Sequence, residues 1–145
     1  MISIHRLALV PYSAAQMYAL VADIAAYSQF LPWCGGARVL SDDGNEVIAE
    51  IDIAYGGVHK SFMTRNVLRK DKLIEMRLER GPFSHLHGFW RFHMLDDNAS
   101  KVTLDLEFAV ENRLLSMVLT PVFTNIANQL VDSFHKRAKA VYGVR

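Results

Sequence analysis

The chain has 145 residues, of which 51% are hydrophobic and 21% charged, and its formal net charge is +1. This length and composition favour one folded domain, residues 1–145, with a single core. A net charge near zero gives no overall field that would attract DNA, so any contact with nucleic acid or membrane must come from a local patch. Cys34 is the only cysteine, which excludes an intrachain disulfide and fits a reducing compartment. We therefore expect a cytoplasmic protein, and a monomer.

The first 32 residues predict a strand followed by two short helices. Apolar and polar residues mix over residues 2–10 as in an opening strand. Ser13 and Gln16 match the capping box, in which each side chain satisfies a backbone donor of the first helical turn, so a helix begins there. A second short helix is expected over residues 26–30, because the residue before Pro32 is pushed out of the α region.

Between residues 36 and 110 the apolar period changes from 3.6 to two, which is typical of strands. Turn residues separate the segments, and Gly56-Gly57 is the clearest hairpin signal because glycine adopts the positive φ of the primed turns. Strands joined by such short turns are antiparallel. The six predicted strands are residues 37–40, 47–55, 58–69, 73–80, 86–95 and 101–110.

Residues 112–142 carry apolar side chains at spacings of three and four, which predicts a long amphipathic helix that covers the sheet. Thr120-Pro121 matches a cap followed by proline at the first helical position, and so predicts a short helix over residues 113–119 and a main helix over residues 121–142. A single kinked helix is the alternative. The fold class is α+β: one strand, two small helices, six antiparallel strands and a long C-terminal helix.

Three stretches of the chain carry a family resemblance. They are VPYSAAQMYALVADIAAYSQFLPWC at residues 10–34, GPFSHLHGFWRF at residues 81–92 and PVFTNIANQLVDSFHKRAKAVY at residues 121–142. Together they resemble the coenzyme Q-binding proteins and the RatA-type ribosome association toxins over nearly the whole chain. The motif TRN at residues 64–66 places the chain nearest the RatA-type branch.

This resemblance implies a fold and a choice of functions. These proteins belong to the START-like, Bet v 1-like helix-grip superfamily, which also contains polyketide cyclases, so a curved seven-stranded antiparallel sheet wrapped around the long C-terminal helix is implied. The first implied function is non-catalytic binding of ubiquinone or a related polyprenyl lipid in support of respiration. The alternative is association with the large (50S) ribosomal subunit that blocks subunit joining. A polyketide cyclase-like enzyme is third, but no catalytic motif is present, so we expect no catalysis and no catalytic cofactor.

A curved sheet that faces one helix can enclose an apolar cavity, the usual form of a site for small hydrophobic ligands. We expect a quinone or other lipid there, with Trp33 and Phe83, from two loop segments, beside its ring. The alternative is that the same side chains form a solid core. The expected ligand-binding residues are Leu31, Trp33, Phe83, Leu86, Trp90, Phe92, Leu104, Phe108, Val122, Ile126 and Leu130.

Basic residues gather near the C-terminus, at Lys136, Arg137 and Lys139. Such a patch can neutralise phosphates of ribosomal RNA or lipid head groups, so we expect it to contact the large ribosomal subunit or, peripherally, the inner membrane. The alternative is a solvated helix end, where cations complement the helix dipole.

Three histidines, His85, His87 and His93, share one strand face by parity. Zinc sites require three or four ligands, and no carboxylate or cysteine of matching parity lies close by in the sequence. We therefore expect a solvated face and no metal.

Overall fold

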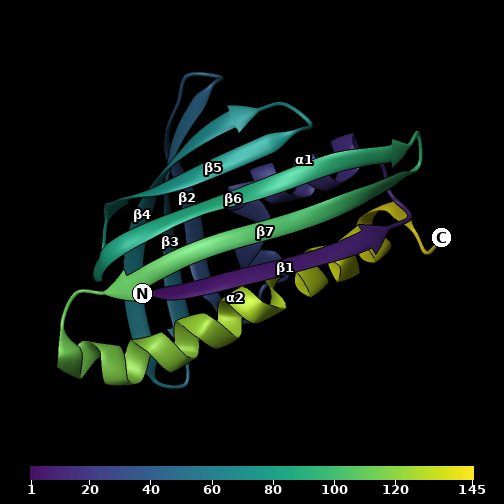
Figure 1. Ribbon diagram of the computed structural model, residues 1–145. Coiled ribbons are helices and arrows are strands. Elements are labelled where there is room, and N and C mark those ends of the chain that lie inside the picture. Colours follow the sequence, from purple (N-terminus) through teal and green to yellow (C-terminus); the bar gives the residue numbers. More distant parts are fainter.

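In the computed structural model, which describes residues 1–145, one seven-stranded antiparallel sheet curves around the long helix α2 (Arg113–Tyr142) (Figure 1). The strand order is β1-β7-β6-β5-β4-β3-β2, so the first strand of the chain pairs with the last. This α+β helix-grip arrangement, with two short helices between β1 and β2, is the predicted fold class and is confirmed.

All the predicted strands are present, and those next to turns extend further than predicted. The bounds of β4 and β5 agree with the prediction, whereas β6 begins three residues earlier than predicted. The Gly56-Gly57 turn is also confirmed, with φ of 58° and 81° at the two glycines. The strands are β1 (Ile2–Val10), β2 (Cys34–Asp42), β3 (Glu46–Tyr55), β4 (Val58–Arg69), β5 (Leu73–Arg80), β6 (Phe83–Asp96) and β7 (Ala99–Val110).

The helix α1 (Ala14–Ala22) begins at the predicted capping box. The Ser13 hydroxyl accepts from the Gln16 backbone N–H at 3.1 Å, and the Gln16 side chain accepts from the Ser13 N–H at 2.9 Å. A 3₁₀ helix, η1 (Ile24–Gln29), follows and starts two residues before the predicted bound. Both elements lie on the concave side of the sheet (Figure 1).

The prediction of two C-terminal helices is wrong, because α2 is one continuous helix with Pro121 inside it. Asn112 caps it, since its side-chain oxygen accepts from the Leu115 N–H at 2.8 Å. Thr120 is therefore not a cap, and its hydroxyl lies 2.7 Å from that of Ser116 one turn earlier. Proline removes one helical hydrogen bond, and Pro121 is on the exposed side of α2, where water can replace it.

One face of α2 packs against the sheet and the other meets solvent. The buried stripe is Leu119, Phe123, Ile126, Ala127, Val131, Phe134 and Ala138. By length and composition alone α2 could cross a membrane, with mean hydropathy 1.4 over 18 residues. Part of that hydropathy comes from exposed side chains near its N-terminus, because Leu114 and Met117 are 79% and 71% exposed.

Candidate functional site

A small apolar cavity of about 70 Å³ lies between the concave face of the sheet and α2. Fourteen of its sixteen lining residues are hydrophobic, and the two polar ones are Thr64 and Asn66 of β4. Six of the eleven residues expected to bind ligand line it: Trp33, Leu86, Trp90, Leu104, Ile126 and Leu130.

The other five expected residues surround the cavity without lining it. Leu31, Phe83, Phe92 and Phe108 are buried in the core, and Val122 is half-buried on α2. The Phe83 ring packs 4.9 Å from that of Phe123 and 5.6 Å from that of Phe62, so it belongs to an aromatic cluster and does not face Trp33 across the cavity. Phe83 is the first residue of β6 and is buried, as the solid-core alternative describes.

The remaining lining residues were not among the predicted ligand-binding residues. They are Ile24, Tyr27, Ile51, Phe62, Thr64, Asn66, Met76, Leu106, Phe123 and Phe134. Alternation along β4 could have identified three of them, since every second residue from Phe62 to Asn66 faces inward. Thr64 and Asn66 are polar, and polar residues in a strand are more often exposed, so their residue types gave no signal that they face inward.

The polar groups around the cavity differ in whether they are satisfied. The Tyr27 hydroxyl donates to the Val21 carbonyl, and complete burial raises the pKa of Tyr27 far above its usual value. The Tyr27 hydroxyl is therefore neutral, and its proton is used in the hydrogen bond to Val21. Asn66 is only 5% exposed, and its Oδ1 atom has no hydrogen-bond partner. Asn66 thus contributes a buried, unpaired amide oxygen to the wall of a cavity that is apolar except at Thr64 and Asn66.

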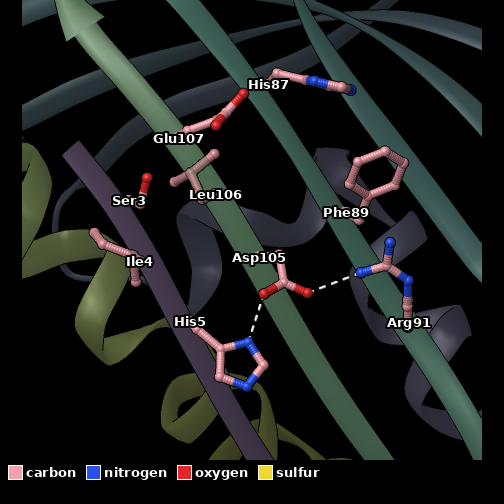
Figure 2. A pocket seen from close by; sticks show the side chains of 9 residues that line it. All are labelled: Ser3, Ile4, His5, His87, Phe89, Arg91, Asp105, Leu106 and Glu107. Atoms are coloured by element: carbon pink, nitrogen blue, oxygen red, sulfur yellow. Dashed lines mark hydrogen bonds and ion pairs between the residues drawn. The ribbon is translucent and has the colours of Figure 1, made fainter. Parts of the chain in front are cut away.

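A second hollow, of about 470 Å³, lies on the outer face of the sheet where β1, β7 and β6 run side by side (Figure 2). Asp105 lies at its centre, with His5 Nδ1 2.5 Å from one carboxylate oxygen and Arg91 Nη1 donating to the other at 2.8 Å. The Arg91 guanidinium also stacks over Phe89, 4.6 Å from the ring centroid. These charges are paired and exposed, which leaves neither an activated nucleophile nor a free cation for an anion.

The histidines of β6 point outward as expected, and carboxylates of the two neighbouring strands lie beside two of them. His85 lies 3.1 Å from Glu107 of β7, and His87 lies 2.8 Å from Glu75 of β5. Both carboxylates come from neighbouring strands, which parity along one strand could not reveal. No group of three or more potential ligands gathers in metal-binding geometry.

The arginine of the TRN motif is also paired with carboxylates. Arg65 donates to Glu79 through two nitrogens at 3.1 Å and also to Glu46. The hydrogen bond from Arg65 is the main cause that lowers the pKa of the Glu79 carboxyl. The positive charge of Arg65 is thus balanced by two carboxylates, so Arg65 adds little positive potential to the surface.

The basic end of α2 is different, because Lys136, Arg137 and Lys139 take part in none of the nine ion pairs. Lys136 and Lys139 are exposed. The Arg137 guanidinium stacks 4.8 Å above the Phe30 ring and donates to the Gln29 side chain at 3.3 Å. This surface therefore carries uncompensated positive charge on a rigid helix.

Comparison with protein families gives one match over most of the chain. A family described as "Polyketide cyclase / dehydrase and lipid transport" matches residues 10–135. The chain is 46% identical over 140 residues to a Pseudomonas aeruginosa protein named ribosome association toxin RatA, with 97% of both chains covered. It is 42% identical to the Escherichia coli K12 protein of the same name, over 98% of this chain and 90% of that one. The Xenopus laevis coenzyme Q-binding protein COQ10 homolog B is 29% identical over 91% of this chain and 56% of its own length.

Solved structures share the fold. An aromatase/cyclase of Streptomyces, Zhui, superposes with a TM-score of 0.84 at 17% identity, over 95% of this chain and 93% of that one. That likeness shows the fold alone. An 18 kDa protein of Caulobacter crescentus, solved in solution, has a TM-score of 0.76 at 32% identity, over 99% of this chain and all of that one.

Proposed function

We propose that this chain, which belongs to the polyketide cyclase/dehydrase and lipid transport family, associates with ribosomes. The observation that carries the proposal is identity of 40–46% with relatives named RatA, over 97–98% of this chain and 90–97% of theirs. The resemblance to coenzyme Q-binding and RatA-type proteins, predicted from three stretches of sequence, is confirmed.

The basic end of α2 supports this proposal and supplies a contact surface. Cations without carboxylate partners retain their attraction for phosphates, and binding releases the counterions that phosphates hold. Lys136 and Lys139 extend into solvent, while Arg137 is oriented by Phe30. We place the contact with the large subunit at this basic end of α2. A protein bound to the large subunit through this surface would block subunit joining. In this function the protein works in the cytoplasm.

Sedimentation tests the association directly. Cell extract is run through sucrose gradients at low and high salt, and the protein is detected in each fraction. The proposal predicts cosedimentation with large subunits at low salt and release at high salt, because contacts with phosphate weaken as salt rises. Absence from every ribosomal fraction at low salt would contradict it.

The second candidate function is binding of an apolar ligand, and the interior cavity favours it. Its lining is almost entirely hydrophobic with one unsatisfied amide, the usual pattern of a ligand site. One relative is named a coenzyme Q-binding protein, and the family description includes lipid transport. Ubiquinone or another polyprenyl lipid would be the cargo.

The volume of the cavity limits which ligands this second function could involve. The cavity of about 70 Å³ is well below the roughly 300–1,000 Å³ of typical ligand sites. A lipid can enter only if α2 moves away from the sheet. Lipid extraction and native mass spectrometry of protein purified from its host test for a bound ligand, and a protein without lipid would argue against this function.

Catalysis is not part of the proposal. Tyr27 is the only lining residue with a titratable side chain, and its raised pKa keeps it protonated at neutral pH. A cyclase needs an acid or base within reach of its substrate. This cavity therefore lacks the groups for the chemistry of the cyclases that share its fold.

A further inference from the structure

The N-terminal half of α2 carries a second apolar face, which the sheet does not cover. Leu114, Met117, Val118 and Pro121 are exposed, and the first three are 79%, 71% and 55% exposed. They occupy positions i, i+3, i+4 and i+7, so they form one stripe along the helix. The buried stripe that begins at Leu119 faces the opposite way. An exposed apolar patch of this kind marks a surface that contacts another molecule or lipid.

The hydropathy of α2 is only partly explained by its packing on the sheet. One 18-residue window has a mean hydropathy of 1.4, which is high enough for a membrane span, yet only 28% of that window is buried inside the protein. In the core helix of a soluble protein, the protein itself covers the side chains that give such a value. Most of the apolar window of α2 is instead left to face its surroundings.

The same outer face of α2 becomes basic toward the C-terminus. At about 100° of rotation per residue, Lys136 and Lys139 lie on the side of the helix that carries the apolar stripe. Arg113 lies beside the first residue of the stripe and is also exposed. Four residues of α2 are basic, whereas Asp132 is its only acidic residue. Because α2 runs along the molecule from one end to the other, this face offers a long surface that is apolar at one end and cationic at the other (Figure 1).

We propose that the outer face of α2 binds the surface of an anionic lipid bilayer. Leu114, Met117 and Val118 enter the boundary between head groups and acyl chains, and the cations of this face contact lipid phosphates. The helix lies on the bilayer and does not cross it, because its other face stays packed on the sheet. This contact goes beyond the ribosome association and the interior ligand binding proposed above, and it depends on neither.

A second copy of the chain fits this face less well than a bilayer does. The stripe has four side chains, whereas a stable protein interface uses roughly 20–30 residues on each side. Pairing through this face would also bring together two helices that each have four basic residues and one acidic residue. Anionic lipid neutralises those cations, and its affinity rises with each apolar side chain that enters.

Vesicle flotation tests the contact with the full chain. The protein is mixed with vesicles of phosphatidylcholine alone, or with vesicles that also contain phosphatidylglycerol, and the bound fraction is measured. We expect binding to the anionic vesicles at low salt, and about tenfold weaker binding to the neutral ones, because each cation near an anionic surface adds to the affinity. If the protein does not bind the anionic vesicles at low salt, the proposal is wrong.

The stripe is removed without a change of charge by converting Leu114, Met117 and Val118 together to glutamine. All three side chains are exposed and glutamine is a good helix former, so the fold should be retained, which circular dichroism checks. We expect the affinity for anionic vesicles to fall about tenfold or more, because the apolar area that enters the bilayer is lost. Unchanged affinity in this variant would refute a role of the stripe.

The matched control makes the same change at three exposed leucines of the sheet. Leu7, Leu9 and Leu95 are 53%, 65% and 49% exposed, and none of them belongs to α2. Their conversion to glutamine should leave vesicle binding as it is in the wild type. An equal loss of binding in the control and in the stripe variant would mean that general surface hydrophobicity, and not this face, holds the vesicle.

A fluorescent residue in the stripe shows directly whether this face enters the bilayer. Trp33 and Trp90 are buried, so lipids with brominated acyl chains should quench them little. The indole introduced by Met117→Trp should shift its emission to shorter wavelength on anionic vesicles and be quenched by the brominated lipid. Vesicle binding without this additional quenching would show that another surface makes the contact.

Two further measurements separate the lipid contact from other partners of this face. Sedimentation equilibrium of the wild type and the stripe variant should give the same mass, and a dimer that the variant abolishes would assign the stripe to a second copy. The stripe variant should also cosediment with large ribosomal subunits as the wild type does, because Lys136, Arg137 and Lys139 are intact. Loss of that cosedimentation would assign the stripe to the ribosome and contradict the lipid contact.

Discussion

Asn125 on α2 donates a hydrogen bond of 3.1 Å to the hydroxyl of Tyr55, at the end of β3 beside the hairpin turn. This bond joins the N-terminal half of α2 to the sheet, while the C-terminal half is held by the Tyr142 hydroxyl on the Gln16 carbonyl and by Arg137 on Gln29. The N-terminal half also contains Pro121, which weakens the helix there. A ligand would therefore enter where α2 separates from the sheet at Tyr55.

Removing this bond should speed ligand entry. In Tyr55→Phe the Asn125 amide loses its partner, and an exposed bond of this kind contributes about 0.5–1.5 kcal/mol. We expect an apolar probe such as 4-hexylphenol to enter about two to ten times faster. Stopped-flow fluorescence of Trp33 and Trp90, which line the cavity, measures this rate. Tyr142→Phe removes a comparable bond at the other end of α2 and should leave the rate unchanged. Equal rates in Tyr55→Phe and the wild type would rule out this entry route.

The capping box should stabilise the domain measurably. Ser13→Ala removes the oxygen that accepts from the Gln16 N–H, and loss of such a cap costs about 1 kcal/mol. Urea unfolding gives the free energy of unfolding of both forms. Ser84→Ala is the control, because its hydroxyl makes only a long 3.4 Å contact with the Ala109 carbonyl. If the two variants lose the same stability, the capping box does not act as described.

Replacing Gly81 by any residue with a side chain should destabilise the protein. Its φ is 153°, and a Cβ atom there would lie 2.6 Å from the Cβ of Phe62, which lines the cavity. Gly81→Ala therefore combines backbone strain with overlap, and should lower the free energy of unfolding by about 3 kcal/mol. Gly57→Ala carries a positive φ but meets no atom within 4 Å, so it should cost about 1 kcal/mol. Thermal unfolding of both variants measures the difference, and equal losses would show that the overlap is relieved freely.

His135 should make stability depend on pH. Burial, followed by the charge of Lys139, lowers its pKa below the ordinary value of 6.5, and Asp132 opposes this shift. The unfolded chain then binds more protons than the folded one between the two pKa values, so stability rises with pH up to about 6.5 and falls as the pH drops below it. In His135→Gln this part of the pH dependence should be absent, so the difference in unfolding free energy between the variant and the wild type should change with pH. A constant difference from pH 5 to 8 in urea unfolding would contradict the prediction.

Local rules predicted the elements of this fold well. The Ser13 capping box and the Gly56-Gly57 turn depend on neighbouring residues only, and both were found where predicted. Thr120-Pro121 satisfied a local rule equally well, yet α2 continues through it because Asn112 already supplies the cap. A local pattern shows which structure a segment can form. Where two residues, such as Asn112 and Thr120, could each cap a helix, the whole helix decides which of them does.

Sites were harder to predict, because they depend on neighbours that only the fold brings together. Glu75 and Glu107 lie beside His87 and His85 through pairing of strands. Phe83 fulfilled the pattern of a large apolar residue in a loop segment, but packs in the core against Phe123. Asn66 was visible in the sequence within TRN, although nothing along the strand showed that its amide is buried without a partner.

The claim that the basic end of α2 holds this protein on ribosomes can be tested by a gradient experiment with charge variants. Lys136, Arg137 and Lys139 are changed together to glutamine. The control changes Arg69, Lys70 and Lys72, which also lie outside every ion pair, and so removes the same net charge from another surface.

We predict that the control cosediments with large ribosomal subunits at low salt as the wild type does, whereas the α2 variant remains at the top of the gradient. Each lost phosphate contact should also reduce the salt dependence of binding by about one unit of slope. Retention of the α2 variant in the large-subunit fractions, or equal loss of both variants, would contradict the claim.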